Sequence, residues 1–275
     1  MTTARTCAYC GRDSDLTNEH VFPECFNKTF DAITTAKTPA GEKAVLSDLE
    51  IHDVCGECNN GPLSSLDAYF CALNDKYFST IIHSGDCVKF EYDFERLLRV
   101  LLKIGYNVAR ARKWPLANWQ DTAHYIRGTA PRPLGFRLFL QLTIPTPLKD
   151  TKLRFPPHVT EVPPLPIRAY IMELANLSGV IGAYMLSVWS YRFFVLREDK
   201  RASRIAARRS VEKWLRKTRG ASELDSRGVA TIYASSVTVL DDTATSPIFL
   251  EQLSLARELK SAVESKKSKS RNRGA

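Results

Sequence analysis

Apolar residues recur at helical spacing in two stretches of the chain. In the first, Gly61-Pro62 is typical of a helix start and precedes apolar positions on one face: Leu63, Leu66, Tyr69, Phe70 and Leu73. In the second, Asp93 is a candidate N-cap before a longer apolar face: Phe94, Leu97, Leu98, Leu101 and Ile104. The pattern therefore predicts one helix from about residue 63 and another from about residue 93.

Between residues 134 and 196 the pattern changes to short runs that are rich in branched and aromatic residues. Three such runs are the strand candidates, LGFRLFLQLTI, IRAYIMEL and AYMLSVWSYRFFVL, and clusters of proline between the first two are typical of turns and loops. One more strand is predicted in ATIYASSVTVL, over 230–240. Together these runs predict a small β-sheet.

One uncharged segment, 174–191, has the length of a short membrane span. Asparagine, serine and glycine interrupt it, and SGV or IGA suits a turn, so we favour two buried strands over a membrane helix. The first residues, MTTARTCAYC, also lack the apolar core of a secretory signal. We expect a cytoplasmic protein that has no membrane partner.

After these strands a basic helix is predicted over 198–220, and the segment 197–219 contains ten Lys and Arg against three acidic residues. Four apolar residues are expected to face inward: Ile205, Val211, Trp214 and Leu215. The candidate nucleic-acid contacts are Arg201, Arg204, Arg208, Arg209, Lys213 and Arg216. A solvated helix face explains the same charges equally well. Another helix is predicted over 246–265, followed by a disordered basic tail over 266–275.

Composition and charge divide the chain in a second way. A length of 275 residues with 44% apolar and 25% charged residues is typical of a globular protein of one large or two ordinary domains. Residues 1–75 contain 5 Lys and Arg and 12 Asp and Glu, which gives this part a net charge of −7. Because the whole chain has a net charge of +9, the remaining residues have a net charge of +16. The basic part suits a polyanionic partner, and the acidic part would need metal cations to approach phosphate.

Four of the seven cysteines form two Cys-x2-Cys pairs, Cys7 with Cys10 and Cys55 with Cys58, and 44 residues lie between the pairs. Two such turns complete a tetrahedral four-sulfur site, which suits zinc, and glycine in each pair frees the backbone to surround the ion. A four-thiolate site has no open coordination position, so this zinc is expected to be structural. The alternative is a set of unrelated core cysteines or a redox dithiol.

The three remaining cysteines, Cys25, Cys71 and Cys87, have no partner at such spacing. We interpret them as core residues, since unpaired cysteine is commonly buried. All thiols of the chain are then expected to be reduced or bound to metal.

The stretches CAYCG, NEHVFP and VCGECNNGPLSSLD resemble the HNH endonuclease family, whose fold is the ββα-metal motif. The resemblance covers 7–67 and is strongest to the branch with Glu-His and Cys-Asn-Asn-Gly. It implies that His20 is the general base for the attacking water, a role that suits an imidazole near neutral pH. It also implies that Glu19 and Asn59 hold a catalytic Mg²⁺ or Mn²⁺, with Asn60 as the adjacent alternative.

Two positions depart from the family pattern. The middle asparagine that orients the histidine has no clear counterpart, and its candidate replacements are Asp48, Glu50, His52 and Asp53. Pro62 stands where the branch commonly has a bulky aromatic residue. An ordinary surface ion pair is the alternative interpretation of Glu19 beside His20.

The sequence thus predicts an α+β protein of two parts and a tail. Residues 1–75 are expected to form a zinc-bound ββα-metal module, and 76–265 an α+β domain that binds substrate or a partner. The expected activity is metal-dependent hydrolysis of DNA phosphodiester bonds, giving a nick or a double-strand break, and RNA is the alternative substrate. A regulatory protein partner would suit an effector of prokaryotic defence. The alternative is a zinc-stabilised module that binds nucleic acid without cutting it.

Overall fold

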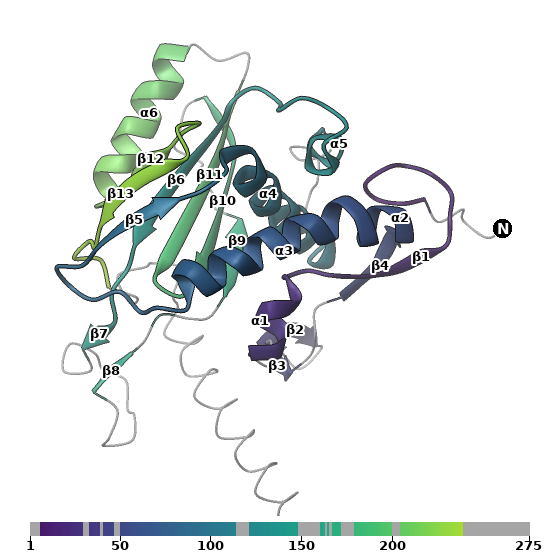
Figure 1. Cartoon of the computed structure of the whole chain (residues 1–275), viewed down its shortest axis with the longest axis horizontal. Helices are drawn as coiled ribbons and strands as arrows, with labels where there is room; N and C mark the ends of the chain where they lie inside the picture. Colours follow the sequence, from purple (N-terminus) through teal and green to yellow (C-terminus); the bar gives the residue numbers. More distant parts are fainter. Residues whose placement is uncertain are drawn as a thin grey trace, which may run out of the picture.

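A computed structural model describes residues 6–29, 33–38, 41–46, 50–113, 121–147, 160–162, 164, 167–171, 179–199 and 204–238. Figure 1 shows the arrangement of its helices and strands. The predicted helix over 246–265, the predicted tail over 266–275 and Arg201 lie outside the described residues.

The N-terminal part is built on two antiparallel strands. β1 (Leu16–His20) pairs with β4 (Glu50–Cys55), and the register sets Leu16 opposite Cys55 and His20 opposite Glu50. Between them the chain forms α1 (Glu24–Thr29) and a hairpin of β2 (Ile33–Thr38) and β3 (Gly41–Leu46), which the sequence pattern did not predict.

A continuous helical run follows β4 directly. It comprises α2 (Gly56–Cys58), a π-helical turn η1 (Asn59–Leu63), α3 (Ser64–Leu73) and a second π-helical turn η2 (Asn74–Phe78). The predicted start at Gly61-Pro62 is therefore wrong, since the wider π-helical turn accommodates the proline, which has no backbone donor. The predicted apolar face is confirmed, and its buried members are Leu63, Leu66, Phe70 and Leu73.

The second part is organised around a five-stranded antiparallel sheet of strand order β12-β6-β11-β10-β9. Its strands are β6 (Phe136–Leu142), β9 (Arg168–Ile171), β10 (Val180–Val188), β11 (Tyr191–Glu198) and β12 (Ser222–Leu224). Two strand pairs flank it: β5 (Cys87–Glu91) with β13 (Val229–Tyr233), and β7 (Thr146–Pro147) with β8 (Glu161–Val162). The mixed α+β class predicted from the sequence is confirmed.

The described part of the uncharged segment, 179–191, contains β10 and only the first residue of β11, so of the two predicted strands one lies within it. β10 runs through the IGA tripeptide, and the turn into β11 lies instead at Trp189-Ser190, where Trp189 has φ +49°. Among the described residues, no helix has both the length and the apolar character needed to cross a bilayer.

Helices cover both faces of the sheet. α4 (Phe94–Ala111) packs on one face, where the Tyr184 hydroxyl donates to the backbone oxygen of Leu101 at 2.6 Å. Gly105 permits this approach, since a Cβ there would lie 3.2 Å from the Tyr184 ring. As predicted, Asp93 caps α4 by accepting from the Arg96 amide. The short helix α5 (Thr122–Arg127) packs beside α4.

The opposite face of the sheet is covered by α6 (Arg204–Lys217). Val211 and Trp214 of α6 are buried there against Phe139 and Phe194, which confirms their predicted inward orientation. Ile205 is 65% exposed, so its predicted inward position is wrong. The predicted start of this helix at residue 198 is wrong, because Glu198 belongs to β11 and α6 begins at Arg204.

One larger core joins the two predicted parts. It runs from Cys7 and Tyr9 through the α3 and α4 side chains to the α4-facing side of the sheet, including Leu140 and Phe193. The expected boundary between residues 75 and 76 falls within the helical run that ends at Phe78. The N-terminal strand pair therefore packs against the same hydrophobic core as the sheet.

Candidate functional site

The two cysteine pairs lie on loops of different construction. In the first, the Gly11 amide donates to the Cys7 carbonyl at 2.8 Å, and Gly11 has φ +70°, which favours glycine. In the second, Cys55 ends β4 and Cys58 ends α2, so the start of the helical run forms the turn. The Ala8 amide donates to the Asp53 carbonyl at 2.9 Å and ties the two loops together.

The four sulfur atoms fit a tetrahedral metal site. Those of Cys7, Cys10, Cys55 and Cys58 all lie within 4.8 Å of one another, and the Cys10 and Cys55 sulfurs are 3.8 Å apart. Zinc–sulfur bonds of about 2.3 Å in a tetrahedron place the sulfurs about 3.8 Å apart. The predicted grouping of these four cysteines is confirmed, and they can hold a zinc ion.

The pKa values of two of these thiols, Cys10 and Cys58, are shifted in opposite directions. Burial alone would raise the pKa of Cys10, but hydrogen bonds from the Arg12 backbone and side chain, and from Cys7 and Cys55, lower the pKa of this thiol to about 6. Burial raises the pKa of Cys58, and its sulfur neighbours add to the effect. Cys10 is thus the thiol that is already suited to bind metal as thiolate.

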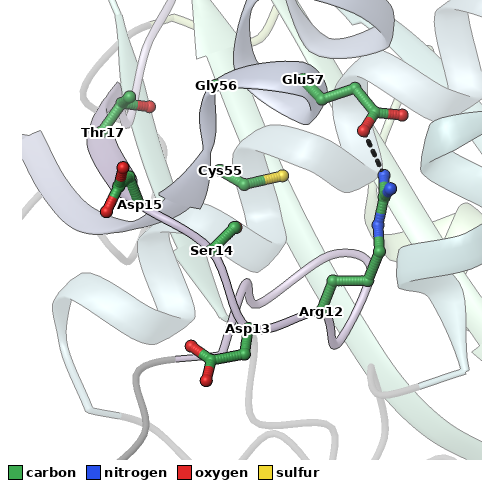
Figure 2. Close-up of a pocket in the computed structure, with 8 residues that line it drawn as sticks. All are labelled: Arg12, Asp13, Ser14, Asp15, Thr17, Cys55, Gly56 and Glu57. Atoms are coloured by element: carbon green, nitrogen blue, oxygen red, sulfur yellow. Dashed lines mark hydrogen bonds and ion pairs between the residues drawn. The ribbon is translucent and has the colours of Figure 1, made fainter.

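A cavity of about 370 Å³ opens beside this cluster, and Figure 2 shows the side chains that line it. Cys55 of the cluster lines the cavity, and Arg12 and Glu57, which also line it, form an ion pair at 2.5 Å. The remaining lining includes Asp13 and Asp15. The cavity therefore has charged side chains in its lining and adjoins the candidate zinc site through Cys55.

Glu19 and His20 stand at the end of β1 and differ in burial. The Glu19 side chain is 2% exposed and points into the protein, whereas the His20 side chain is 35% exposed. Neighbouring residues of a strand face opposite sides, which places one group inside and the other at the surface. His20 is therefore the member of the pair that solvent reaches.

Of the four candidates to orient His20, the structure places Glu50 beside it. His20 Nδ1 lies 3.5 Å from Glu50 Oε1, as the register of β1 with β4 requires. His52 instead contacts Asn18, and Asp53 pairs with Arg110. Asp48 lies outside the described residues.

Asn59 fastens the helical run to β1. Its Nδ2 atom donates to the Thr17 hydroxyl at 3.0 Å and to the Asn18 carbonyl at 2.7 Å. The neighbouring Asn60 is exposed. Asn59 therefore lies against the strand that carries Glu19 and His20, and Asn60 lies further out.

Glu19 belongs to a buried polar network that the sequence analysis missed. Its Oε1 atom lies 2.6 Å from the Lys103 ammonium group and accepts from Asn107 at 3.2 Å. Asn107 also donates to the His20 carbonyl at 3.1 Å. A pattern could have pointed to this network, since Lys103, Asn107 and Arg110 form a polar stripe at i, i+4 and i+7 in the second half of α4, whose other residues are uncharged and mostly apolar.

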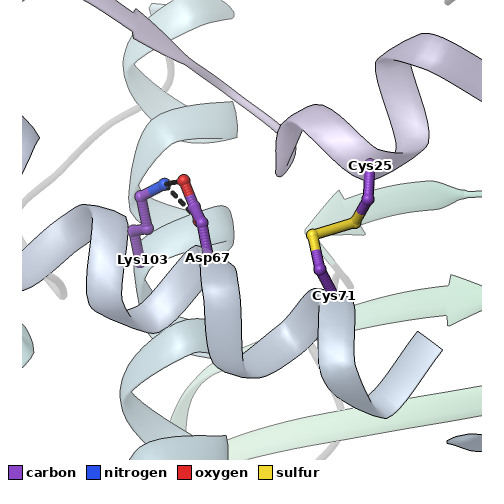
Figure 3. The surroundings of a disulfide bond; sticks show 4 residues. All are labelled: Cys25, Asp67, Cys71 and Lys103. Atoms are coloured by element: carbon purple, nitrogen blue, oxygen red, sulfur yellow. Dashed lines mark hydrogen bonds and ion pairs between the residues drawn. A yellow bond between two sulfur atoms is a disulfide. The ribbon is translucent and has the colours of Figure 1, made fainter. Parts of the chain in front are cut away.

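Asp67 completes the network from α3. Both of its oxygens accept from Lys103, at 2.6 and 2.7 Å, as Figure 3 shows. Burial raises the pKa of Asp67, the Lys103 ammonium opposes that shift, and the nearby charge of Glu19 adds to it. Lys103 is therefore the shared counter-ion of the buried Glu19 and the partly exposed Asp67.

Cys25 and Cys71 form a disulfide between α1 and α3 (Figure 3). Their interpretation as unpaired, reduced core thiols is therefore wrong. The bond joins residues 46 positions apart, and it depends on α1 folding back onto α3, which residue spacing does not reveal. Cys87 is exposed on β5, so its expected place in the core is also wrong.

The predicted nucleic-acid contacts lie on α6 as far as the structure describes them. Arg208, Arg209, Lys213 and Arg216 are exposed, and Arg208 pairs with Glu212 at 3.0 Å. Arg204 begins the helix. Arg197, counted in the same basic segment, is buried in β11 and pairs with Asp121, so it does not contribute to this surface.

Comparison with protein-family models, with curated proteins and with solved structures finds no match for this chain.

Proposed function

We propose that this chain is a metal-dependent endonuclease of the HNH kind that hydrolyses phosphodiester bonds in DNA. The observation that carries the proposal is the convergence of three motifs on one small unit. Glu19 and His20 end β1 of an antiparallel strand pair, the helical run follows that pair, and Asn59, directly after Cys58 of the four-cysteine cluster, contacts Thr17 and Asn18 of β1. This arrangement of strands, helix and cysteines is the one that the resemblance implies.

His20 is the group to which we assign the proton transfer. Its side chain reaches solvent, and Nδ1 lies beside Glu50 Oε1, which would hold the ring in one orientation. We therefore assign the base role to Nε2. In the proposed reaction His20 takes the proton of an attacking water, a new phosphorus–oxygen bond forms, and the bond to the leaving oxygen breaks. The leaving oxygen then takes a proton from solvent.

The two metals of the proposal differ in how well the chain fits them. The cysteine cluster fits zinc, which would hold both loops in place and supply folding free energy. Glu19, in contrast, does not form a ready site for Mg²⁺ or Mn²⁺, because its Oε1 atom contacts Lys103 and Asn107. The side-chain nitrogen of Asn59 donates hydrogen bonds to β1, so its side-chain oxygen, Oδ1, is the atom that would coordinate a hard cation.

Plasmid cleavage tests the proposal directly. Zinc-loaded full chain with Mg²⁺ or Mn²⁺ is expected to convert supercoiled plasmid to open-circle or linear DNA. His20→Ala is expected to lower the rate by at least about 100-fold, the usual contribution of general base catalysis. His83→Ala is the matched control, because His83 is exposed and lies outside the described site. Equal rates for wild type and His20→Ala would rule out His20 as the base.

A second candidate function is binding of nucleic acid without cleavage. Two observations favour it: the buried ion pair at Glu19, and the exposed basic residues of α6. Charge reversal at Arg209 and Lys213 is then expected to weaken DNA binding and to reduce its salt dependence by about one unit of slope per lost phosphate contact. Binding by a wild-type chain that cleaves under no divalent metal would favour this function over the endonuclease.

A regulated form of the endonuclease is also part of the proposal. A nuclease of weak sequence preference would have to be silent until it is needed, as in prokaryotic defence. Cleavage that requires an added partner protein or small ligand, and that His20→Ala abolishes, would support this form. Constitutive cleavage by the purified chain would contradict it.

A further inference from the structure

Asn107 is a buried amide of α4 that contacts residues from two other parts of the chain, and it is 0% exposed. Its Oδ1 atom accepts from the Tyr9 hydroxyl and from the Arg110 guanidinium, each at 2.5 Å. Its Nδ2 atom donates to Glu19 Oε1 at 3.2 Å and to the His20 carbonyl at 3.1 Å. Each polar atom of this amide therefore has two hydrogen-bond partners.

The chemistry of these partners fixes the direction in which the amide points. A guanidinium group only donates hydrogen bonds, and a backbone carbonyl only accepts them. Oδ1 must therefore face Arg110, and Nδ2 must face the His20 carbonyl. The reversed amide would place two donors together at Arg110 and two acceptors together at His20, which is costly in a buried site.

Tyr9 connects this amide to the first cysteine loop. Tyr9 lies between Cys7 and Cys10 in the sequence and is 1% exposed. Its ring packs edge-on against Tyr106 of α4, with 5.3 Å between the ring centroids. The loop that carries two of the candidate zinc ligands is therefore joined to the His20 backbone by two successive hydrogen bonds through one side chain of α4.

His20 is the last residue of β1, and two different groups contact it there. Glu50, opposite it in the register, contacts the imidazole ring, whereas Asn107 contacts the backbone carbonyl. A general base must have its accepting nitrogen within hydrogen-bond reach of the proton that it removes. The direction of the ring and the position of the backbone both contribute to that placement.

We propose that Asn107 is a positioning residue for His20, and that it fixes the His20 end of β1 against the first cysteine loop. The inference rests on the proposed function, since it assigns the group that supports the proposed general base. Asn107 lies outside the segment 7–67 that carries the resemblance, and it acts through the backbone rather than on the substrate. A displacement of about 1 Å can lower a rate by about 100-fold, so such a contact can control the rate.

Cleavage kinetics of the zinc-loaded full chain test this role by separating kcat from KM. Asn107→Leu, which is similar in size but forms no hydrogen bonds, is expected to lower kcat at least about tenfold and to leave KM unchanged. Tyr106→Phe is the matched control and is expected to keep the wild-type kcat, because the Tyr106 hydroxyl also joins α4 to the cysteine loop but donates to the Ala8 carbonyl, at 3.1 Å. A wild-type kcat in Asn107→Leu, with or without a change in KM, would overturn the proposal.

An NMR measurement without DNA decides the matter if Asn107→Leu does not fold or if cleavage is not observed. The Val21 amide belongs to the same peptide unit as the His20 carbonyl, so its resonance responds to the hydrogen bond from Asn107. Tyr9→Phe removes only the hydroxyl that donates to Asn107, and it is expected to shift the Val21 amide resonance. Tyr106→Phe is expected to leave that resonance in its wild-type position. No shift in Tyr9→Phe, or an equal shift in both variants, would overturn the proposal.

The two measurements separate this inference from the proposed function. A Val21 shift in Tyr9→Phe alone, combined with no plasmid cleavage under any divalent metal, would refute the endonuclease and leave Asn107 as the residue that holds the His20 backbone. Cleavage that needs His20 but is unaffected by Asn107→Leu would do the reverse.

Discussion

Gly11 directly follows the first cysteine pair and Gly56 lies inside the second, and the two glycines differ in backbone conformation. Gly11 has φ +70°, whereas Gly56 begins a helix and a Cβ there would make only ordinary contacts of 3.8 Å. Gly11→Ala is therefore expected to lower the free energy of unfolding by about 1–2 kcal/mol, the cost of a left-handed backbone for an L side chain. Gly56→Ala is expected to change it by less than about 0.5 kcal/mol. Urea denaturation of the two variants, compared with wild type, measures both effects.

The outcome is informative because the sequence alone treated these glycines alike. Equal destabilisation by the two substitutions would contradict the described geometry of the loops. Loss of zinc from Gly11→Ala, measured alongside, would show that the strain reaches the metal site.

Single residues were predictable where a local spacing carries the chemistry. The four zinc-site cysteines were found because each pair forms its own turn, whatever lies between them. Lys103 and Asp67 were not found, because their contact depends on how α4 packs against α3. For the same reason, four residues were open as partners of His20 until the pairing of β1 with β4 placed Glu50 beside it.

At the scale of elements, the disulfide ties α1 to α3. It closes a loop of 46 residues, which corresponds to about 4 kcal/mol of unfolded-state entropy by the chain-entropy model. Cys71→Ser is expected to lower the free energy of unfolding by about 2–4 kcal/mol, since strain and residual structure reduce such effects. Thermal or urea unfolding with and without a reductant measures the same contribution in the wild-type chain.

The matched control for this experiment is Cys87→Ser, because Cys87 is exposed and belongs to neither sulfur cluster. Its stability is expected to equal that of wild type and to respond to the reductant in the same way. A wild-type chain whose stability is unaffected by the reductant would contradict the disulfide.

Zinc is expected to stabilise the loops on either side of β1 and β4. Cys58→Ser is predicted to lose the bound zinc and to melt at a lower temperature, because a metal that binds only the folded state contributes its binding free energy to folding. Elemental analysis of wild type should give about one zinc per chain. Zinc retained by Cys58→Ser at the wild-type content would contradict a four-sulfur site.

Elements were predicted best where one periodicity extends over many residues. α4 and the strands of the sheet follow from such runs, and Asp93 marks a helix start by its own side chain. The start of the helical run at Gly56 was missed, because the cysteine loop begins it and a π-helical turn accommodates Pro62. The β2–β3 hairpin was missed because its residues are not strongly apolar.

At the scale of the whole molecule, the sheet separates two surfaces that the sequence had assigned to one substrate. α4 and the N-terminal strand pair lie on one face of the sheet, and α6 lies on the other, as Figure 1 shows. The strands alternate between these faces, so that Tyr184 contacts α4 while Met185 faces the α6 side. A duplex at His20 would therefore meet α6 only by passing around the sheet, which no pattern of charges along the chain could reveal.

The shared core also makes a prediction about pH. Burial raises the pKa of several tyrosine hydroxyls, to about 12 for Tyr69 and Tyr191 and well above the usual 10 for Tyr9 and Tyr184. A tyrosine whose pKa is higher in the folded state contributes stability that is complete below pH 10 and is lost as the pH rises through its folded pKa. The free energy of unfolding is therefore expected to fall above pH 10, by about 1.4 kcal/mol per pH unit for each shifted tyrosine, and the melting temperature is expected to fall with it.

Tyrosinate absorbance, recorded against pH together with circular dichroism, checks this expectation. The buried tyrosines Tyr9 and Tyr184, whose pKa values are raised by burial, should ionise together with unfolding. Tyr9 and Tyr184 lie in the N-terminal part and in the sheet, and both contact α4 residues, through Asn107 and Leu101. If the two parts unfold as one unit, a single alkaline transition follows, whereas two separate transitions would show that the shared core does not couple them.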